Sequence, residues 1–270
     1  MSGLSGYPRR DAELLLGHVL GADPVSLLTH PERALSAVEC AQFADLVERR
    51  SACEPMQYLT GEQEFFGLRF EVTPDVLIPR PETEHLIEAV LERYQREQEV
   101  RIVDVGTGSG AIAVTLAHAL PRSRVTAVDL FPAALAVARR NAERHGVAER
   151  VRFLASDLLA GIGEGDFDAV ISNPPYVAEG EVLEAQVAEY EPASALYAGP
   201  TGLEVYEQLI PQAGRALKPG GWLMLEIGYG QSPAVESLLD GWAGVAFLRD
   251  LQGIARVAVA QKPFTTLKKD

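Results

Sequence analysis

A glycine-rich turn at residues 104–111 is the first feature of this sequence that could bind a ligand. It reads DVGTGSGA and directly follows an apolar run that begins at residue 100. Glycines permit a tight turn and let a ligand approach the backbone, and the helix expected next begins with unpaired N–H groups. Asp129 ends the following apolar segment, about 20 residues on, where an acid commonly binds ribose hydroxyls. This spacing indicates a nucleotide-like cofactor.

Three interpretations of this turn remain open from its residues. It could be a connection without a ligand, or a dinucleotide site, since Gly106, Gly108 and Ala111 loosely fit that fingerprint. The third interpretation is an S-adenosylmethionine site, in which the glycine loop is shorter and an acid precedes it. Asp104 occupies that place. A carboxylate there would repel a pyrophosphate, whereas the zwitterionic methionine end can use one.

Two polar residues end further apolar segments. Asp157 follows residues 150–156, where it could accept a hydrogen bond from an adenine amine or act as an N-cap for the next short turn. Asn173 follows residues 167–172 and leads into Pro174, Pro175 and Tyr176. Prolines end strands, so a plain turn is the simplest interpretation of this second stretch.

The elements that must position these residues alternate between strand and helix from about residue 100 onward. The expected strands are residues 100–105, 124–130, 150–157, 167–173, 221–228, 244–250 and 255–262. The expected helices are residues 110–120, 132–146, 202–221 and 232–242. This alternation predicts an α/β fold with a mostly parallel sheet, helices on both faces, and ligands beyond the carboxyl ends of the strands. Asn173 should then share a sheet edge with the glycine turn.

The first 60 or so residues have a different pattern. Residues 11–21 and 36–52 show helical spacing of apolar side chains, and Ser36 with Glu39 forms a capping-box signature. Residues 66–71 alternate as a strand does, and residues 76–78 are expected to return as its partner after a turn. The sequence therefore predicts a helical region joined by a hairpin to the larger domain.

Composition narrows the class of protein. The 270 residues are 47% hydrophobic and 23% charged, which is ordinary for a globular protein, and the formal net charge is −14. No apolar run is long enough to span a membrane, and we expect no signal peptide. Cys40 and Cys53 lack ligand spacing and are interpreted as small core residues in a reducing compartment; we expect no metal and a cytoplasmic protein. The acidic balance argues against a nucleic-acid partner.

Nine stretches, taken together, resemble one known family. They read PRRDAELLLGHVLG, YLTGEQEFFGLRF, VLIPRPETEHLIE, VDVGTGSGAIAV, AVDLFPAALAVARRNAERHG, SDLLAG, SNPPYV, YEPASALYAGPTGLEVY and LKPGGWLMLEIG. The chain is similar here to the HemK/PrmC protein-(glutamine-N5) methyltransferases, which modify a glutamine in peptide chain release factors. The stretches cover nearly the whole chain in the family's order, and IPRPETE combined with NPPY is specific for it.

The resemblance implies a seven-stranded, Rossmann-like class I methyltransferase domain at residues 81–270. It also implies an N-terminal helical substrate-recognition domain at residues 1–62 and a β-hairpin linker at residues 63–80. The implied reaction moves a methyl group from S-adenosyl-L-methionine, leaving S-adenosyl-L-homocysteine, to the side-chain nitrogen of a GGQ glutamine. The implied partners are release factors, and we expect a monomer that binds neither nucleic acid nor membrane.

The resemblance also assigns the site residues. The cofactor contacts fall on Gly106, Thr107, Gly108, Ser109, Gly110, Asp129, Asp157, Leu158 and Asn173. The substrate contacts fall on Asn173, Pro174, Pro175, Tyr176 and Phe65, of which Asn173, Pro174 and Tyr176 are assigned to catalysis. Phe65 is weighed as a pocket wall against packing between domains. Leu158 stands where some members have an aromatic residue, so it packs on the adenine without stacking.

The implied chemistry explains the choice of residues. A carboxamide nitrogen is a weak nucleophile because its lone pair is delocalised into the carbonyl. The side-chain oxygen of Asn173 and the carbonyl of Pro174 can accept its two N–H groups and turn the lone pair toward the methyl group. Tyr176 can lie against the flat amide.

Two alternatives remain. An adenine-N6 methyltransferase would use the same motif on an exocyclic amine, but it would need a basic groove. A non-catalytic cofactor-binding adaptor would not need an intact NPPY stretch.

Overall fold

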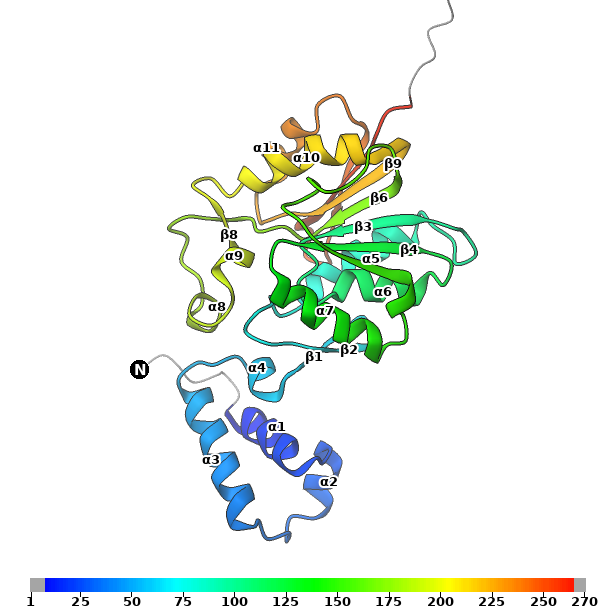
Figure 1. The fold of residues 1–270 in the computed structure, drawn as a ribbon. Helices are drawn as coiled ribbons and strands as arrows, with labels where there is room; N and C mark the ends of the chain where they lie inside the picture. The colour runs from blue at the N-terminus through cyan, green and yellow to red at the C-terminus, as the bar shows by residue number, and fades with distance from the viewer. Residues whose placement is uncertain (1–7, 265–270) are drawn as a thin grey trace, which may run out of the picture.

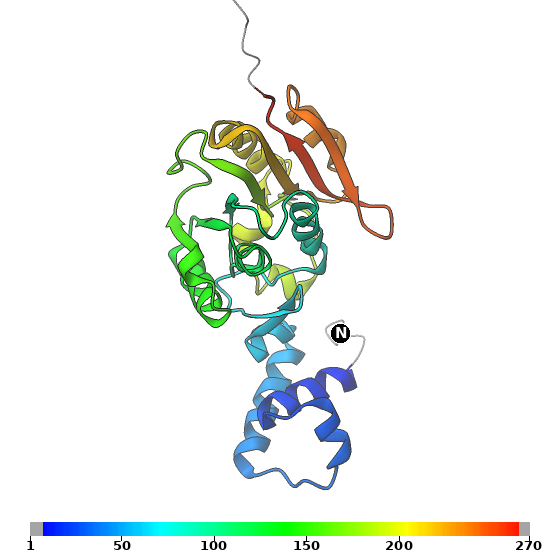
Figure 2. The ribbon, with the colours of Figure 1, turned by 90° about the vertical axis from the view of Figure 1, so that its right-hand side faces the viewer.

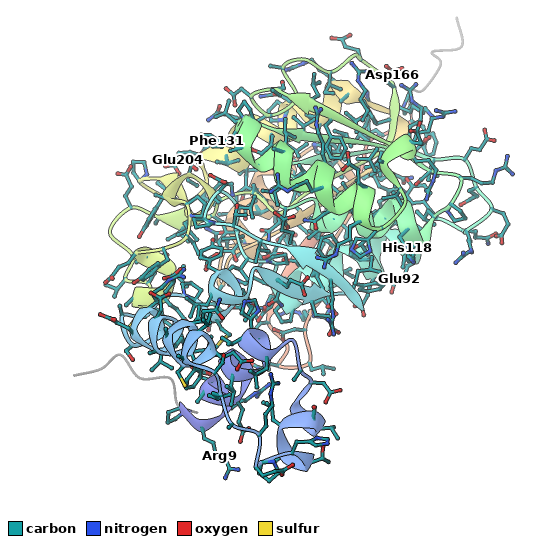
Figure 3. All side chains as sticks on the ribbon, turned by 60° about the horizontal axis from the view of Figure 1, so that its bottom comes forward. Arg9, Glu92, His118, Phe131, Asp166 and Glu204 are labelled. Carbon is teal, nitrogen blue, oxygen red and sulfur yellow. The ribbon has the colours of Figure 1, made fainter. Side chains whose placement is uncertain are left out.

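The computed structural model describes residues 8–264, and it contains a small group of helices followed by a larger sheet domain (Figure 1). The first four helices are α1 (Pro8–Leu20), α2 (Pro24–Thr29), α3 (Ala37–Ser51) and α4 (Met56–Thr60). Turning the molecule by 90° shows that these helices extend away from the sheet domain (Figure 2). Figure 3 accordingly places Arg9 of α1 and Asp166 of the sheet domain at opposite ends of the molecule.

The small helical region has its own core and one well-defined cap. Leu15, Leu46 and Leu59 are buried together. The predicted capping box is confirmed, because the Ser36 hydroxyl accepts the Glu39 N–H at 3.2 Å and the Glu39 carboxylate accepts the Ser36 N–H at 2.7 Å. The predicted burial of Cys40 is wrong, since this residue lies exposed on α3.

A hairpin links the helices to the sheet domain, but its strands differ from those we predicted. The strands are β1 (Glu62–Phe65) and β2 (Leu68–Glu71), which pair antiparallel. The turn is Phe66–Gly67, and both residues have positive φ, 50° and 73°, as a two-residue hairpin turn of type I′ requires. The partner of the predicted strand is therefore β1, which comes before it in the chain. The strand that we expected at residues 76–78 does not form. Val76 and Ile78 are instead buried beside Tyr58, whose hydroxyl donates to the Val76 carbonyl at 2.7 Å.

The large domain is built on seven strands, as predicted. They are β3 (Arg101–Val105), β4 (Arg124–Asp129), β5 (Val151–Ala155), β6 (Phe167–Ser172), β9 (Leu217–Glu226), β10 (Ala243–Arg249) and β11 (Ala255–Gln261). Their order in the sheet is β10-β11-β9-β6-β3-β4-β5. The five strands from β9 to β5 run parallel, and β10 and β11 are antiparallel to their neighbours.

Helices cover both faces of this sheet (Figure 1). One face carries α5 (Glu84–Leu91), α6 (Ala111–Ala119) and α7 (Pro132–Arg144), and the other carries α10 (Glu204–Ala216) and α11 (Ser232–Leu238). The short elements are η1 (Pro81–Thr83), η2 (Ala148–Arg150), β7 (Val177–Ala178), α8 (Ala185–Ala188), α9 (Ala193–Leu196) and β8 (Tyr197–Gly199).

The strand order creates one switch point. The chain runs from β3 outward to β4 and β5, then returns to place β6 on the other side of β3. Loops that leave β3 and β6 therefore diverge at their carboxyl ends, which opens a crevice between them. No helix among residues 8–264 is long and apolar enough to span a membrane.

Candidate active site

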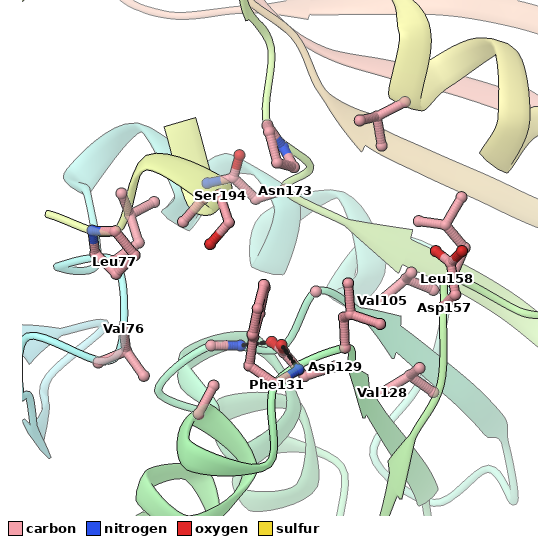
Figure 4. Close-up of a pocket in the computed structure, with 18 of the residues that line it drawn as sticks. Val76, Leu77, Val105, Val128, Asp129, Phe131, Asp157, Leu158, Asn173 and Ser194 are labelled. Carbon is pink, nitrogen blue, oxygen red and sulfur yellow. Dashed lines mark hydrogen bonds between the residues drawn. The ribbon is translucent and has the colours of Figure 1, made fainter. Parts of the chain in front are cut away.

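A pocket lies at the carboxyl edge of the sheet, at this switch point (Figure 4). It encloses about 910 Å³ of empty space, counting its open mouth. The loops that follow β3, β4, β5 and β6 all contribute to its wall, which brings the predicted Gly106, Asp129, Asp157 and Asn173 together. Their convergence was predictable because parallel strands end at a common edge.

The glycine turn forms one wall, and its glycines have two different roles. Gly106 and Gly108 line the pocket with φ of 71° and 53°, and no atom lies within 4 Å of where a Cβ would be. They keep space open for a ligand. Gly110 has φ of 82°, but its Cβ would lie 3.0 Å from the Ala138 Cβ, so it serves the packing of α6 on α7.

Thr107 and Ser109 are buried and do not reach the pocket. The Thr107 hydroxyl donates to Asp104 at 2.6 Å, and the Ser109 carbonyl accepts from Asn141 at 2.9 Å. Of the five predicted residues in this turn, the structure thus brings only Gly106 and Gly108 to the pocket wall.

Asp104 lies beneath the turn, fully buried, rather than beside the ligand space. One carboxylate oxygen accepts from Thr107 and from the Ala113 N–H at 3.1 Å, which ties the turn to the start of α6. The other oxygen is buried without a protein partner. Burial raises the pKa of this carboxyl from 3.8 to about 7. The expectation that Asp104 meets the methionine end directly is therefore not supported.

Asp129 and Phe131 shape the floor of the pocket. The Asp129 carboxylate accepts the Gly108 N–H at 2.9 Å and the Phe131 N–H at 3.0 Å, as the dashed lines in Figure 4 mark. Burial raises the pKa of Asp129, although these N–H groups act in the opposite direction. Each oxygen keeps a lone pair for a ligand hydroxyl. Phe131, which our sequence reasoning missed, lines the pocket; its signal was an aromatic residue directly after the strand-ending acid.

The charge of the wall discriminates between the cofactor classes left open above. Its ionisable members are Asp75, Asp129 and Asp157, and no lysine, arginine or histidine is among the residues that line it. A pyrophosphate would be repelled here, whereas a sulfonium and an ammonium group would be attracted. Leu158 also lines this wall, with an unusual positive φ of 45°.

Asn173 faces the glycine turn from the opposite wall (Figure 4). Its side-chain N–H donates to the Thr83 hydroxyl at 3.1 Å, and this hydroxyl donates to Glu226 at 2.6 Å. The Tyr176 hydroxyl donates to the other oxygen of Glu226 at 3.3 Å. Pro175 lines the pocket, while Pro174 is buried. Thr83 and Glu226 were not among the predicted residues.

Phe65 is not part of this pocket. It is 1% exposed, packs in the main core, and lies edge-on to Phe70 with 6.1 Å between ring centroids. Phe65 therefore fits the alternative of packing between domains, and we no longer assign it to substrate binding.

Two charged residues near the hairpin have structural partners. The Glu84 carboxylate accepts the Phe66 N–H at 2.8 Å and fixes the hairpin turn, while Arg80 pairs with the buried Glu191.

Comparisons with known proteins agree with this architecture. Residues 2–61 match the PrmC N-terminal domain family, and residues 82–191 match the Methyltransferase small domain family. Among solved structures, a methyltransferase from Pyrococcus furiosus superposes with a TM-score of 0.53, at 22% identity over 74% of this chain and 91% of the other. A Thermus thermophilus 16S rRNA N2 G1207 methyltransferase, in complex with AdoMet and guanosine, has a TM-score of 0.56 at 22% identity over 74% and 49% of the two chains. These likenesses concern the fold.

Sequence relatives are much closer. The release factor glutamine methyltransferase of Koribacter versatilis is 49% identical over 95% of this chain and 92% of its own length. The protein of the same name from Geobacter sulfurreducens is 44% identical over 92% and 88% of the two chains. This similarity extends over the helical region, the hairpin and the sheet domain alike. The chain therefore belongs to the release factor glutamine methyltransferase family.

Proposed function

We propose that this protein transfers a methyl group from S-adenosylmethionine to the side-chain amide nitrogen of a glutamine in peptide chain release factors. The observation that carries this proposal is the fixed amide of Asn173 at a pocket whose wall is acidic. Because the amide N–H is held by Thr83, its oxygen is left to accept a hydrogen bond from an incoming N–H group. Family membership supports the same reaction.

The predicted cofactor contacts other than Asn173, which is assigned to the acceptor glutamine, each acquire a role in this proposal. When bound, the cofactor supplies an electrophilic methyl group on a positively charged sulfur. Gly106 and Gly108 would leave room for it against the backbone, and Asp129 would accept from the ribose hydroxyls. Asp157 and Leu158, which line the pocket, would face the adenine, and Phe131 would offer the aromatic surface that Leu158 does not. Thr107, Ser109 and Gly110 act indirectly, by holding the turn in shape.

The acceptor glutamine is bound by the stretch after β6. The Asn173 oxygen and the Pro174 carbonyl accept its two N–H groups, and the ring of Tyr176 lies against the amide plane. Proline fixes φ, so the backbone that carries these acceptors needs no ordering on binding. Such alignment can contribute roughly 7–11 kcal/mol to a two-reactant step. After methyl transfer the nitrogen is cationic and acidic, and it loses one proton to water.

The remaining assignments extend this proposal. We assign release-factor recognition to residues 1–62, linkage to residues 63–80 and catalysis to residues 81–270. The net charge of −14 and the acidic pocket favour a protein substrate over a nucleic acid. We further propose that the protein acts as a cytoplasmic monomer.

Asn173→Ala tests the proposal, because it removes the acceptor oxygen and leaves the glycine turn, Asp129 and Asp157 on the pocket wall unchanged. With labelled cofactor, the wild type should methylate a release factor and should not methylate one whose GGQ glutamine is changed to alanine. We expect the variant to lose at least about 100-fold in kcat, with a small change in cofactor affinity by calorimetry. Equal losses of turnover and cofactor binding would contradict the role of Asn173. Methylation of DNA instead of the release factor would favour the adenine-N6 alternative.

A further inference from the structure

A buried carboxylate stands directly behind the catalytic amide and has no role in the reaction described so far. Glu226, the last residue of β9, is 2% exposed. Both of its oxygens accept hydrogen bonds from hydroxyl groups, one from Thr83 at 2.6 Å and the other from Tyr176 at 3.3 Å. The first of these hydroxyls is itself the acceptor for Asn173. A buried charge is costly, so a carboxylate at this place suggests a function that an apolar residue would not perform.

The direction of the hydrogen bonds in this chain of three residues follows from their chemistry. An ionised carboxylate can only accept hydrogen bonds, so the Thr83 hydroxyl must donate its single hydrogen to Glu226. The oxygen of Thr83 is then left with lone pairs only and can accept solely from the amide nitrogen of Asn173. If the amide turned by 180°, its oxygen would meet the oxygen of Thr83 without a hydrogen between them.

We propose that Thr83 and Glu226 form a positioning pair, which holds the Asn173 amide in the one orientation that presents its oxygen to the acceptor glutamine. This inference rests on the proposed function and explains a requirement of it. A reversed amide would present N–H groups to the N–H groups of the substrate, and neither set would find an acceptor in the other. Neither Thr83 nor Glu226 lines the pocket, so both act through Asn173.

The surroundings of Glu226 make the pair sensitive to pH. The pKa of its carboxyl is raised to about 7, chiefly by burial; Glu82 acts in the same direction, and the Thr83 and Tyr176 hydroxyls and Arg256 act against it. Tyr206 donates to the Glu226 backbone carbonyl at 2.9 Å and leaves the carboxylate untouched. Once protonated, Glu226 can donate to Thr83, which frees the Thr83 hydrogen to bond the Asn173 oxygen and to stabilise the reversed amide. Turnover should therefore rise as the pH rises through about 7.

Two variants of Thr83 separate the hydroxyl from the shape of the side chain. Thr83→Val keeps the shape and loses the hydroxyl, whereas Thr83→Ser keeps the hydroxyl. We expect kcat for release-factor methylation to fall about 10- to 100-fold in the first variant and to stay within about threefold of the wild type in the second. Cofactor affinity, measured by calorimetry, should stay within about twofold in both, because the pair lies behind Asn173 and not on the cofactor wall.

Glu226→Gln and Tyr206→Phe complete the test. The first should lower kcat and remove its rise with pH near 7; the second removes a buried hydroxyl from the same neighbourhood and should keep the rise. Asp104 also titrates near pH 7, but it lies under the glycine turn, so its effect should appear in the cofactor KM and persist in Glu226→Gln. Thermal midpoints identify any variant that fails to fold.

Several outcomes would overturn the positioning role. The first is a wild-type kcat in both Thr83→Val and Glu226→Gln. The second is an equal loss of kcat in Thr83→Val and Thr83→Ser. The third is a Glu226→Gln variant whose kcat still rises with pH near 7 as it does in the wild type. If the wild type itself methylates no glutamine, the proposed function fails and the inference fails with it. Normal wild-type turnover with unaffected variants would refute the positioning pair alone.

Discussion

Replacing Glu226 by glutamine should make the protein more stable at alkaline pH while it lowers activity. The carboxyl has a pKa of 4.5 in its unperturbed state, and burial raises it to about 7 in the folded protein. Between these two values the folded state binds the proton more tightly than the unfolded chain does. The contribution of this group to stability therefore falls as the pH rises from 4.5 to 7, and it stays at its lowest value above pH 7.

The magnitude follows from the same shift. The difference of 7 − 4.5 pH units, at about 1.36 kcal/mol per unit, amounts to at most about 3 kcal/mol. Glutamine keeps the shape of the side chain and can bond to the Thr83 and Tyr176 hydroxyls, but it carries no charge. We expect the variant to match the wild type near pH 4.5 and to exceed it by up to about 3 kcal/mol above pH 7. For a chain of this size this corresponds to up to roughly 10 °C in Tm.

The assay is urea unfolding at several pH values between 4.5 and 8.5, followed by tryptophan fluorescence. Both tryptophans, Trp222 and Trp242, lie in the sheet domain, so the signal reports on the domain that contains Glu226. The wild-type free energy of unfolding is subtracted from that of the variant at each pH. This difference cancels the contributions of the titrating groups that the two proteins share, including Asp104. A difference that does not grow with pH, or a variant less stable than the wild type at pH 8, would refute the argument.

Four further variants test the site and its support. Asp129→Ala removes the acceptor that holds the loop and the ribose, so we expect the cofactor Kd to rise at least about 100-fold by calorimetry; a change below threefold would contradict this role. Gly110→Ala should cost about 2–3 kcal/mol in urea unfolding, from its positive φ and the 3.0 Å approach to Ala138. The added methyl group of Gly106→Ala would meet no such contact. This variant should therefore be destabilised less than Gly110→Ala, but it should lose more affinity for the cofactor. Phe65→Leu should lower stability by about 1 kcal/mol and leave the KM for the release factor unchanged; a raised KM would restore Phe65 to the substrate site.

Local sequence patterns determined the elements and the edge at which the site forms. Strand and helix periodicities predicted all seven strands of the sheet, and Ser36 with Glu39 predicted a cap that the structure contains. Parallel strands carry the residues that follow them to one edge, which is why Asp129, Asp157 and Asn173 were expected together. These inferences succeed because each depends on hydrogen bonding and burial within a short segment.

The first hairpin shows where local patterns stop being sufficient. Alternation at residues 66–71 was read as a strand, yet Phe66 and Gly67 form the turn. Neither the predicted return at residues 76–78, which is all apolar, nor the actual partner at residues 62–65, which is mostly polar, alternates between apolar and polar side chains, so alternation cannot identify the partner strand. Only the turn geometry, with two positive φ values, selects between them.

The support of the site was decided by tertiary structure alone. Thr83 and Glu226 are 143 positions apart and meet because α5 packs near the end of β9. Asp104 and Phe65 resemble pocket residues in their types, yet the fold buries both. Periodicity tells which face of a strand turns inward, but the partner that a buried polar group finds there depends on how distant segments pack. For this protein the sequence therefore determined which residues lie at the ligand edge of the sheet, and the fold determined which partner holds the Asn173 amide.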